Sequence, residues 1–185
     1  MHTSPAIRKR SLLSLFSRQQ ALFQVLLTYS YYDPEVGYRK GLSHLAAMLL
    51  MWMGEEDAFW ALVQLMEDKK YGLRDVYKPG SGTLEDLQKR LQHVIHQALP
   101  ALEKHLEEQS ICLGSITKHW FTQCFLEIVP FSLAIRLWDL FLLEGQQMLT
   151  TMAYTTLKVH QSKFSGTEEA RALGVEEPGS LAEAQ

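Results

Sequence analysis

The chain has 185 residues, of which 46% are hydrophobic and 10% aromatic, and these values suit one globular domain with a buried core. Its formal net charge of −3 gives no overall attraction to nucleic acid, and no long basic stretch favours such a partner. The longest apolar run, Leu45 to Met53, has nine residues, far fewer than the roughly 20 that a membrane-spanning helix needs.

Charge distinguishes the two ends of the chain from its centre. No acidic residue precedes Asp33, whereas Arg8, Lys9 and Arg10 are basic. We assign residues 1–17 to a divergent basic lead-in; a mitochondrial presequence, which has a similar composition, is the alternative. Residues 166–185 carry five glutamates against one arginine and no aromatic residue. With so little to bury, residues 165–185 are predicted to form an acidic, disordered tail.

Apolar residues recur at intervals of three or four between residues 18 and 164, the spacing of one face of a helix. Prolines and glycines interrupt this pattern, and Pro100 is expected to kink or divide the longest helix. No alternating strand pattern of useful length occurs, so an all-α, multi-helix domain is predicted. The predicted helices cover residues 18–32, 42–53, 55–66, 84–108, 115–128, 131–143 and 147–164.

Three local features within this pattern carry further expectations. Residues 71–82 are predicted to form a loop, because they contain the sequence Lys-Pro-Gly-Ser-Gly. Thr83 is expected to cap the helix that follows it, with Asp86 three residues later. In the third helix, Trp60 is expected to face inward.

The residue types that bind phosphate or metal occur here only in weak patterns. Residues 80–83 lack the Gly-Lys-Ser/Thr ending of a phosphate loop, so a flexible loop is the preferred interpretation. His93 and His96 lie one helical turn apart without a third ligand at a fixed spacing, and a solvated helix face is predicted. Cys112 and Cys124 are too few for a disulfide framework, and we interpret them as reduced, buried thiols of an intracellular protein. No metal or cofactor is implied for this chain.

Stronger signals come from short motifs whose order and spacing are specific. They are the run from Tyr31 to Tyr38 followed by Gly41, the run Glu55-Glu56-Asp57-Ala58-Phe59-Trp60, the pair Trp120-Phe121, the run Arg136-Leu137-Trp138-Asp139 and the pair Glu144-Gly145. Each alone is an ordinary helix fragment with buried aromatic residues. Together, over residues 18–164, they closely resemble the TBC domain of Rab GTPase-activating proteins.

The resemblance implies an all-helical fold that binds Rab-family GTPases and accelerates their GTP hydrolysis. Members of this family supply two residues in trans, an arginine in an Ile-x-x-Asp-x-x-Arg segment and a glutamine in a Tyr-x-Gln segment. The arginine stabilises charge that develops on the phosphoryl oxygens, and the glutamine orients the attacking water.

This chain departs from both segments. Tyr38-Arg39-Lys40-Gly41 matches the second segment, so Lys40 occupies the glutamine position, and Tyr38, Arg39 and Gly41 are candidate partner-binding residues by resemblance. A lysine donates hydrogen bonds but cannot accept one from water, and a tolerated surface residue is the simpler interpretation of Lys40. None of the six aspartates is followed by an arginine three residues later, so no arginine finger is assigned. The domain is therefore predicted to be degenerate and incomplete at both ends.

The chain is accordingly predicted to regulate Rab-family GTPases, without being an enzyme itself, and with activating ability weak or lost. The alternatives are a non-catalytic module that binds a Rab or another protein, and a fragment that folds poorly alone because lost helices leave apolar faces uncovered. GTP and Mg²⁺ would belong to the partner, and neither nucleic acid nor a transmembrane segment is expected. An intracellular location is expected, cytoplasmic or peripheral to endomembranes, and the oligomeric state is left open.

Overall fold

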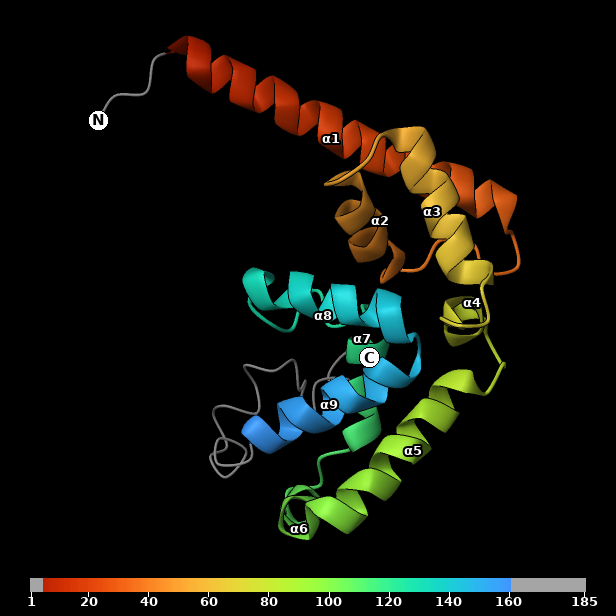
Figure 1. Ribbon diagram of the computed structural model, residues 1–185, viewed down its shortest axis with the longest axis vertical. Coiled ribbons are helices and arrows are strands. Elements are labelled where there is room, and N and C mark those ends of the chain that lie inside the picture. Colours follow the sequence, from red (N-terminus) through yellow and green to blue (C-terminus); the bar gives the residue numbers. More distant parts are fainter. Residues whose placement is uncertain (1–4, 161–185) are drawn as a thin grey trace, which may run out of the picture. The chain divides into compact units, whose positions relative to one another are not determined.

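In the computed structural model, the backbone is described for residues 5–160 and the side chains for residues 17–160. This part of the chain forms nine α-helices and no strand, which confirms the predicted all-α class (Figure 1). None of these helices combines the length and the apolar character that a membrane crossing requires. The chain divides into two compact units, Met1–Pro79 and Gly80–Gln185. The predicted acidic tail lies outside the described residues.

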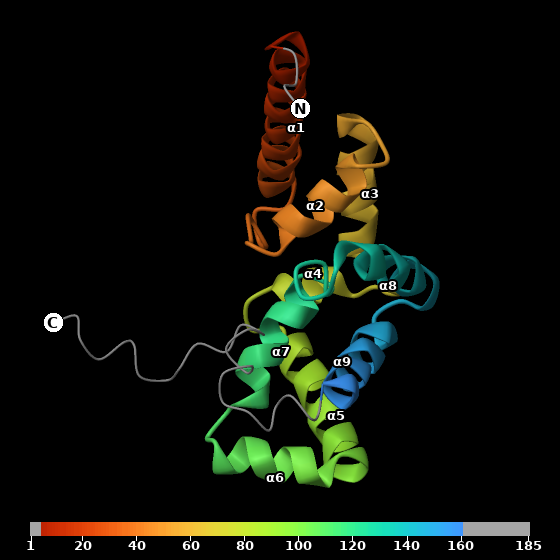
Figure 2. The same cartoon turned by 90° about the vertical axis from the view of Figure 1, so that its left-hand side faces the viewer.

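The first unit contains α1 (Pro5–Tyr32), α2 (Leu42–Leu50), α3 (Glu55–Glu67) and α4 (Leu73–Tyr77). The first three helices pack against one another, and α4 packs against α3 (Figures 1 and 2). Burial of apolar side chains drives this packing. The buried side chains include those of Val25, Tyr29, Leu42, Leu45, Ala46, Ala58, Leu62, Met66 and Leu73.

Helix α1 is longer than predicted, because it begins at Pro5 and not near Arg18. Proline is tolerated in the first turn of a helix, where its missing N–H would have no partner. The helix ends at Tyr32, since Asp33 precedes Pro34 and the residue before a proline disfavours helical backbone. The start of the connection to α2 therefore follows from the local sequence.

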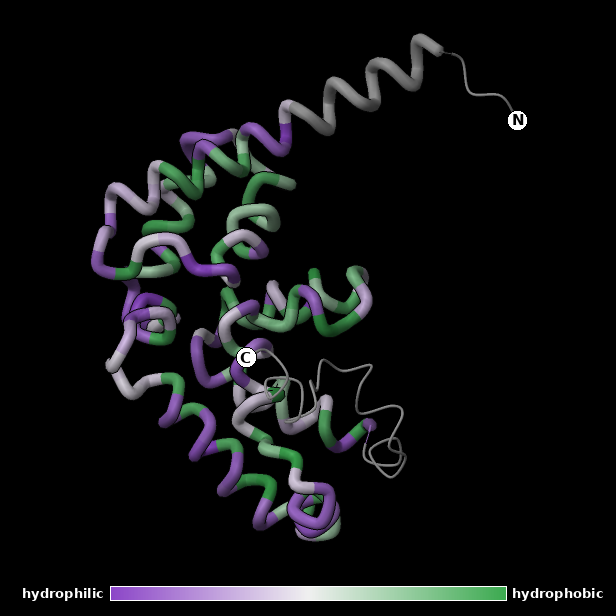
Figure 3. Tube along the Cα trace, turned by 180° about the vertical axis from the view of Figure 1, so that it is seen from behind, coloured by the Kyte–Doolittle hydropathy of each residue, from purple (hydrophilic) through white to green (hydrophobic). Residues whose placement is uncertain are grey.

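Helix α2 is short and almost entirely apolar, and it forms a mainly green stretch in Figure 3. Its buried residues are Leu42, Leu45, Ala46, Met48 and Leu49. Such a helix has no polar face to present to water, so it lies inside the first unit as its sequence predicts.

Helix α3 buries Ala58 and Leu62 but leaves Trp60 54% exposed, so the expectation that Trp60 faces inward is wrong. Trp60 is two residues from each of these buried positions, which places it roughly 200° around the helix from both. Its ring instead packs at the surface against Phe59 and Tyr32, with centroid distances of 5.0 Å and 6.3 Å.

Residues 71–82 are not one continuous loop, because Leu73–Tyr77 forms α4. Leu73, Val76 and Tyr77 are buried at the spacing of one helix face. The loop prediction rests on the sequence Lys-Pro-Gly-Ser-Gly, which comes after this short helix. The prediction was therefore wrong for residues 73–77.

The second unit contains α5 (Thr83–Ala98), α6 (Pro100–Glu108), α7 (Leu113–Thr122), α8 (Phe131–Glu144) and α9 (Gln147–Val159). Helix α5 contacts α6, α7 and α9, and α9 also contacts α7 and α8. Hydrophilic and hydrophobic bands alternate along α5 in Figure 3, as in an amphipathic helix with one buried face. Pro100 divides the longest predicted helix into α5 and α6, as expected.

Thr83 does not cap α5, contrary to the prediction. It is the first residue of the helix, and the preceding Gly82 has φ +78° and provides no side-chain cap. The N–H of Thr83 donates to the hydroxyl oxygen of Ser81 across 3.3 Å. The helix thus begins one residue too early for Thr83 to act as its cap.

Helix α7 is shorter than the helix predicted over residues 115–128, because it ends at Thr122. Cys124 and Phe125 have φ values of 46° and 63°, in the left-handed region. The N–H of Phe125 donates to the carbonyl oxygen of Trp120 across 3.1 Å, the hydrogen bond of a Schellman motif. Glycine usually occupies the place that Cys124 holds in this motif, so the sequence carries no clear signal for the end of the helix.

Aromatic side chains form much of the interior of the second unit. Trp120 and Phe125 are fully buried, with ring centroids 5.6 Å apart. Trp138 is buried and packs against Phe141, also at 5.6 Å. Leu137, next to Trp138 on α8, is half-buried.

Candidate functional site

The segment predicted to correspond to the family's glutamine motif lies in the connection between α1 and α2, residues 33–41. The N–H of Gly37 donates to the carbonyl oxygen of Asp33 across 2.8 Å, which closes a turn around Pro34. The N–H of Val36 lies 3.4 Å from a carboxylate oxygen of the same aspartate, and the side chain of Val36 is buried. Gly37 has φ +61°, a conformation that costs a residue with a Cβ roughly 1–2 kcal/mol. This turn determines where the next residues leave the core.

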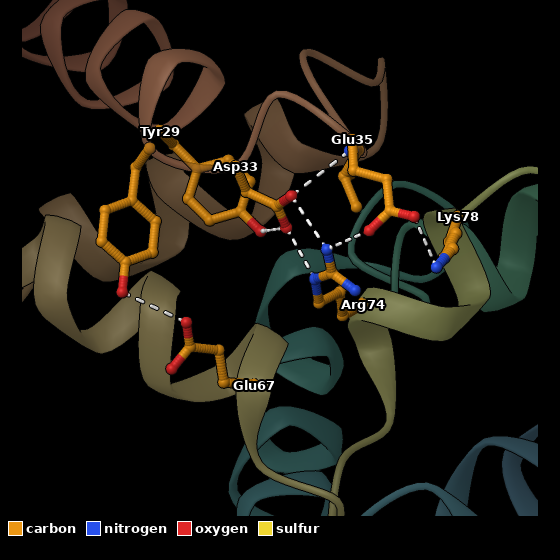
Figure 4. Close-up of polar contacts among 8 residues, drawn as sticks. Tyr29, Asp33, Glu35, Glu67, Arg74 and Lys78 are labelled. Atoms are coloured by element: carbon orange, nitrogen blue, oxygen red, sulfur yellow. Dashed lines mark hydrogen bonds and ion pairs between the residues drawn. The ribbon is translucent and has the colours of Figure 1, made fainter.

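Arg74 of α4 binds both carboxylates of this turn (Figure 4). Its Nε donates to Asp33 Oδ2 across 2.7 Å, and its Nη2 donates to Asp33 Oδ1 across 3.0 Å. The same Nη2 donates to Glu35 Oε2 across 2.7 Å. Lys78, which follows α4, forms a second ion pair with Glu35. These contacts tie the turn to a helix 41 positions away in sequence.

The network is charged at neutral pH. Hydrogen bonding from Arg74 holds the pKa of Asp33 below its usual range, against the opposing effect of burial. Hydrogen bonds from Lys78, and then from Arg74, lower the pKa of Glu35. Burial, followed by the charge of Asp33, raises the pKa of Tyr29, so its hydroxyl remains protonated and donates to Asp33 across 3.3 Å. The turn is therefore held by charge-assisted hydrogen bonds, which are stronger than neutral ones.

Tyr38, Arg39 and Lys40 directly follow the turn and are exposed, and we refer to these three residues as the basic loop. Within residues 17–160 their side chains make no hydrogen bond or ion pair. Gly41 is buried, and the carbonyl oxygens of residues 39–41 accept amide hydrogen bonds of 2.9–3.3 Å from the start of α2. The structure thus brings three of the candidate residues together at the surface and places Gly41 inside.

Positive charge gathers at this point of the first unit. Arg39 and Lys40 precede α2, and no acidic residue lies in the first turn of that helix. The N-terminus of a helix also carries a partial positive charge. An anionic group is the electrostatic complement of such a surface.

The remaining candidate residues lie in the second unit. His93 and His96 are exposed, as predicted. Nε2 of His93 lies 3.0 Å from Nε2 of Gln97, and Nδ1 of His96 lies 2.7 Å from a carboxylate oxygen of Glu103. Cys124 is buried, but Cys112 is exposed just before α7, so the prediction of a buried thiol is wrong for Cys112. Within the described part of the chain, no group of three His, Cys, Asp or Glu residues is placed to hold a metal ion.

Arg74 and Lys78 are not among the functional residues predicted from the sequence. Their spacing of four residues is a usable signal, because residues four apart lie on one face where the chain is helical. Their partners, Asp33 and Glu35, lie two residues apart near Pro34. Nothing local links the two pairs, so only the fold reveals that they meet.

The fold and this loop together define an all-α domain that presents a basic loop beside a helix N-terminus. Residues 5–165 match the family described as the Rab-GTPase-TBC domain. The chain is 34% identical over 146 residues to the Homo sapiens protein "Ecotropic viral integration site 5 protein homolog", an alignment that covers 79% of this chain and 18% of that protein. The chain therefore belongs to the Rab-GTPase-TBC domain family.

A solved structure is similar over most of the same region. The structure titled "Crystal structure of the Chlamydomonas flagellar RabGAP TBC domain" has a TM-score of 0.71 and 26% sequence identity. The match covers 83% of this chain and 51% of the Chlamydomonas chain. This chain thus spans less than two thirds of the length of either relative.

Proposed function

We propose that this chain binds Rab-family GTPases as a regulator and that its GTPase-activating ability is weak or lost. The observation that carries the proposal is Lys40, which is exposed on the basic loop and corresponds by resemblance to the family's glutamine. Membership of the Rab-GTPase-TBC domain family supports a Rab as the partner. Such a partner would place the protein inside the cell, in the cytoplasm or at the periphery of endomembranes.

The chemistry of hydrolysis explains why Lys40 matters. One group must orient the attacking water, and another must stabilise the charge that grows on the phosphoryl oxygens. A glutamine amide both donates and accepts hydrogen bonds, whereas the ammonium group of Lys40 only donates. Lys40 can therefore offer positive charge to a phosphate but cannot accept a hydrogen bond from the water. In these 185 residues, moreover, no aspartate is followed by an arginine three residues later.

The same loop remains suited to binding. Arg39, Lys40 and the N-terminus of α2 offer positive charge to an anionic surface, and Tyr38 is 57% exposed. The contacts of Arg74 hold the preceding turn in place before a partner arrives. Such preorganisation lowers the entropic cost of association. Lys40 consequently also favours a second candidate function, a module that holds a Rab or another protein without changing its hydrolysis rate.

Single-turnover GTP hydrolysis across a panel of Rab proteins tests the proposal, with binding to the GTP-loaded forms measured in parallel and an active TBC domain as positive control. We expect at least one Rab to bind and its hydrolysis to accelerate less than about tenfold, against about 10³–10⁵ for an intact arginine finger. Binding with no acceleration supports the second candidate. Acceleration near 10³ would show that activity is intact, and binding to no Rab would overturn the assigned partner.

A further inference from the structure

The basic loop is attached to a turn that other elements hold in place. Residues 37–39 lie outside regular secondary structure, between the end of α1 and the start of α2. The turn before them contains two carboxylates, Asp33 and Glu35, whose charges repel one another at neutral pH. The direction of the basic loop therefore depends on what neutralises and fixes these two side chains.

The packing of α4 fixes the position of Arg74, so this side chain can hold the two carboxylates in place. Arg74 lies on α4, in which the side chains of Leu73, Val76 and Tyr77 are buried. The Arg74 side chain is 30% exposed, and that of Asp33 is 11% exposed, so the pair is only partly screened by water. Contact with a helix whose apolar face is buried holds the turn more firmly than an ion pair between two fully exposed side chains.

The geometry requires an arginine and not merely a positive charge. The guanidinium is planar and offers several N–H groups in a rigid fork, which lets Arg74 bind both oxygens of Asp33 and reach Glu35 at the same time. Among the described side chains, the ammonium group of Lys78 forms its ion pair with Glu35, which is 53% exposed. Lysine binds as a point charge and cannot form this two-point contact.

We propose that Arg74 is a positioning residue: by binding Asp33 and Glu35 at once, it fixes the turn from which the basic loop projects. Its effect on a partner rests on the function proposed above, because the basic loop is the surface assigned to Rab binding. Arg74 itself belongs to α4 and acts through the turn.

Hydrogen exchange of the full chain, followed by mass spectrometry, tests the positioning role without any partner. Arg74→Gln removes the guanidinium, and Arg74→Lys keeps the positive charge but loses the planar set of N–H donors. Asp33→Asn removes the negative charge of the partner carboxylate. Arg90→Gln is the matched control, since Arg90 is an exposed arginine of α5. The amides of Val36 and Gly37 are hydrogen-bonded to Asp33 in the turn. We expect Arg74→Gln and Asp33→Asn to speed exchange in the peptide that contains these two amides by about tenfold or more, and Arg74→Lys to speed it slightly less.

Three outcomes of this experiment overturn the proposal. The first is exchange at Val36 and Gly37 that Arg74→Gln leaves at the wild-type rate. The second is equal acceleration throughout α1, α2 and α3, which would mean that Arg74 stabilises the whole unit and not the turn. The third is wild-type protection from exchange in Arg74→Lys, which would mean that positive charge alone is enough to hold the turn. If Arg74→Gln does not fold, Arg74→Lys and Asp33→Asn carry the same comparison.

Binding of the same variants to the Rab selected by the panel tests the consequence. We expect Arg74→Gln to weaken binding at least about tenfold at equal folded fraction, and the double variant Arg74→Gln/Asp33→Asn to be no weaker than either single change. Wild-type affinity in an Arg74→Gln variant whose loop exchanges rapidly would overturn positioning of the binding surface. If the wild-type chain binds no Rab, the proposed function fails, and the exchange result still decides the role of Arg74.

Discussion

The N–H of Ile111 donates to the carbonyl oxygen of Leu106 across 2.9 Å, and this bond closes the C-terminal end of α6. Between them, Ser110 adopts φ +55°. This is the same Schellman arrangement that ends α7 at Trp120 and Phe125, again without a glycine. Both helices therefore end with a residue other than glycine whose backbone has the left-handed conformation that favours glycine.

Ser110→Gly should stabilise the protein. The substitution relieves left-handed strain of roughly 1–2 kcal/mol, from which the greater freedom of glycine in the unfolded chain subtracts part, so a net gain of about 0.5–1 kcal/mol is expected. Urea denaturation followed by circular dichroism measures it. Gln109→Gly, one residue earlier and with negative φ, is the control and should not stabilise.

Trp138→Ala should cost about 3–5 kcal/mol in the free energy of unfolding, because the side chain is buried against Phe141. Leu143→Ala, on the same helix but 69% exposed, should change it by less than about 0.5 kcal/mol. Chemical denaturation of both variants provides the comparison. A loss below about 1 kcal/mol for Trp138→Ala would contradict its assignment to the core.

Reversing Arg136 and Asp139 together should be tolerated. Both side chains are exposed on α8, and no ion pair joins them within the described side chains. Exposed pairs at this spacing contribute only a few tenths of a kcal/mol. The thermal midpoint of the double variant should stay close to that of the wild type, and a drop of several degrees would mean that the pair joins neighbouring helices.

Acid should weaken the first unit through Asp33 and Glu35. Their folded-state pKa values lie below the ordinary ones, so their stabilisation is complete above the unfolded pKa and is lost as the pH falls through the folded values. The window therefore lies below about pH 4.5. Arg74→Gln should flatten the fall in stability across this window, as measured by urea denaturation between pH 6 and pH 2. An unchanged slope would rule out Arg74 as the main cause of the lowered pKa of Asp33.

Lys40→Gln alone should not restore strong GTPase activation. Glutamine would orient water, but the charge-stabilising arginine would still be missing, and residues that act as a unit are not additive. Adding an upstream segment with Ile-x-x-Asp-x-x-Arg together with Lys40→Gln should raise the single-turnover rate far more. If Lys40→Gln by itself accelerated hydrolysis about 10³-fold, then Arg8, Arg10 or Arg39 must reach the phosphate.

Local sequence determined the helical class, most helix positions and the division at Pro100. Helices depend on contacts between residues three and four apart, and a proline removes a backbone donor wherever it stands. The identity of the basic loop also came from short motifs, since Tyr38 to Gly41 are consecutive. These features need no knowledge of distant parts of the chain.

The tertiary structure alone decided which residues hold the basic loop in place. Arg74 meets Asp33 only because α3 and α4 return the chain to the end of α1, and a contact across 41 positions leaves no local periodicity. The exposure of Trp60 and the left-handed backbone of Cys124 likewise depend on packing within their units. Local propensities specify the elements, but the free energy that selects side-chain partners comes from burial and charge pairing between elements distant in sequence.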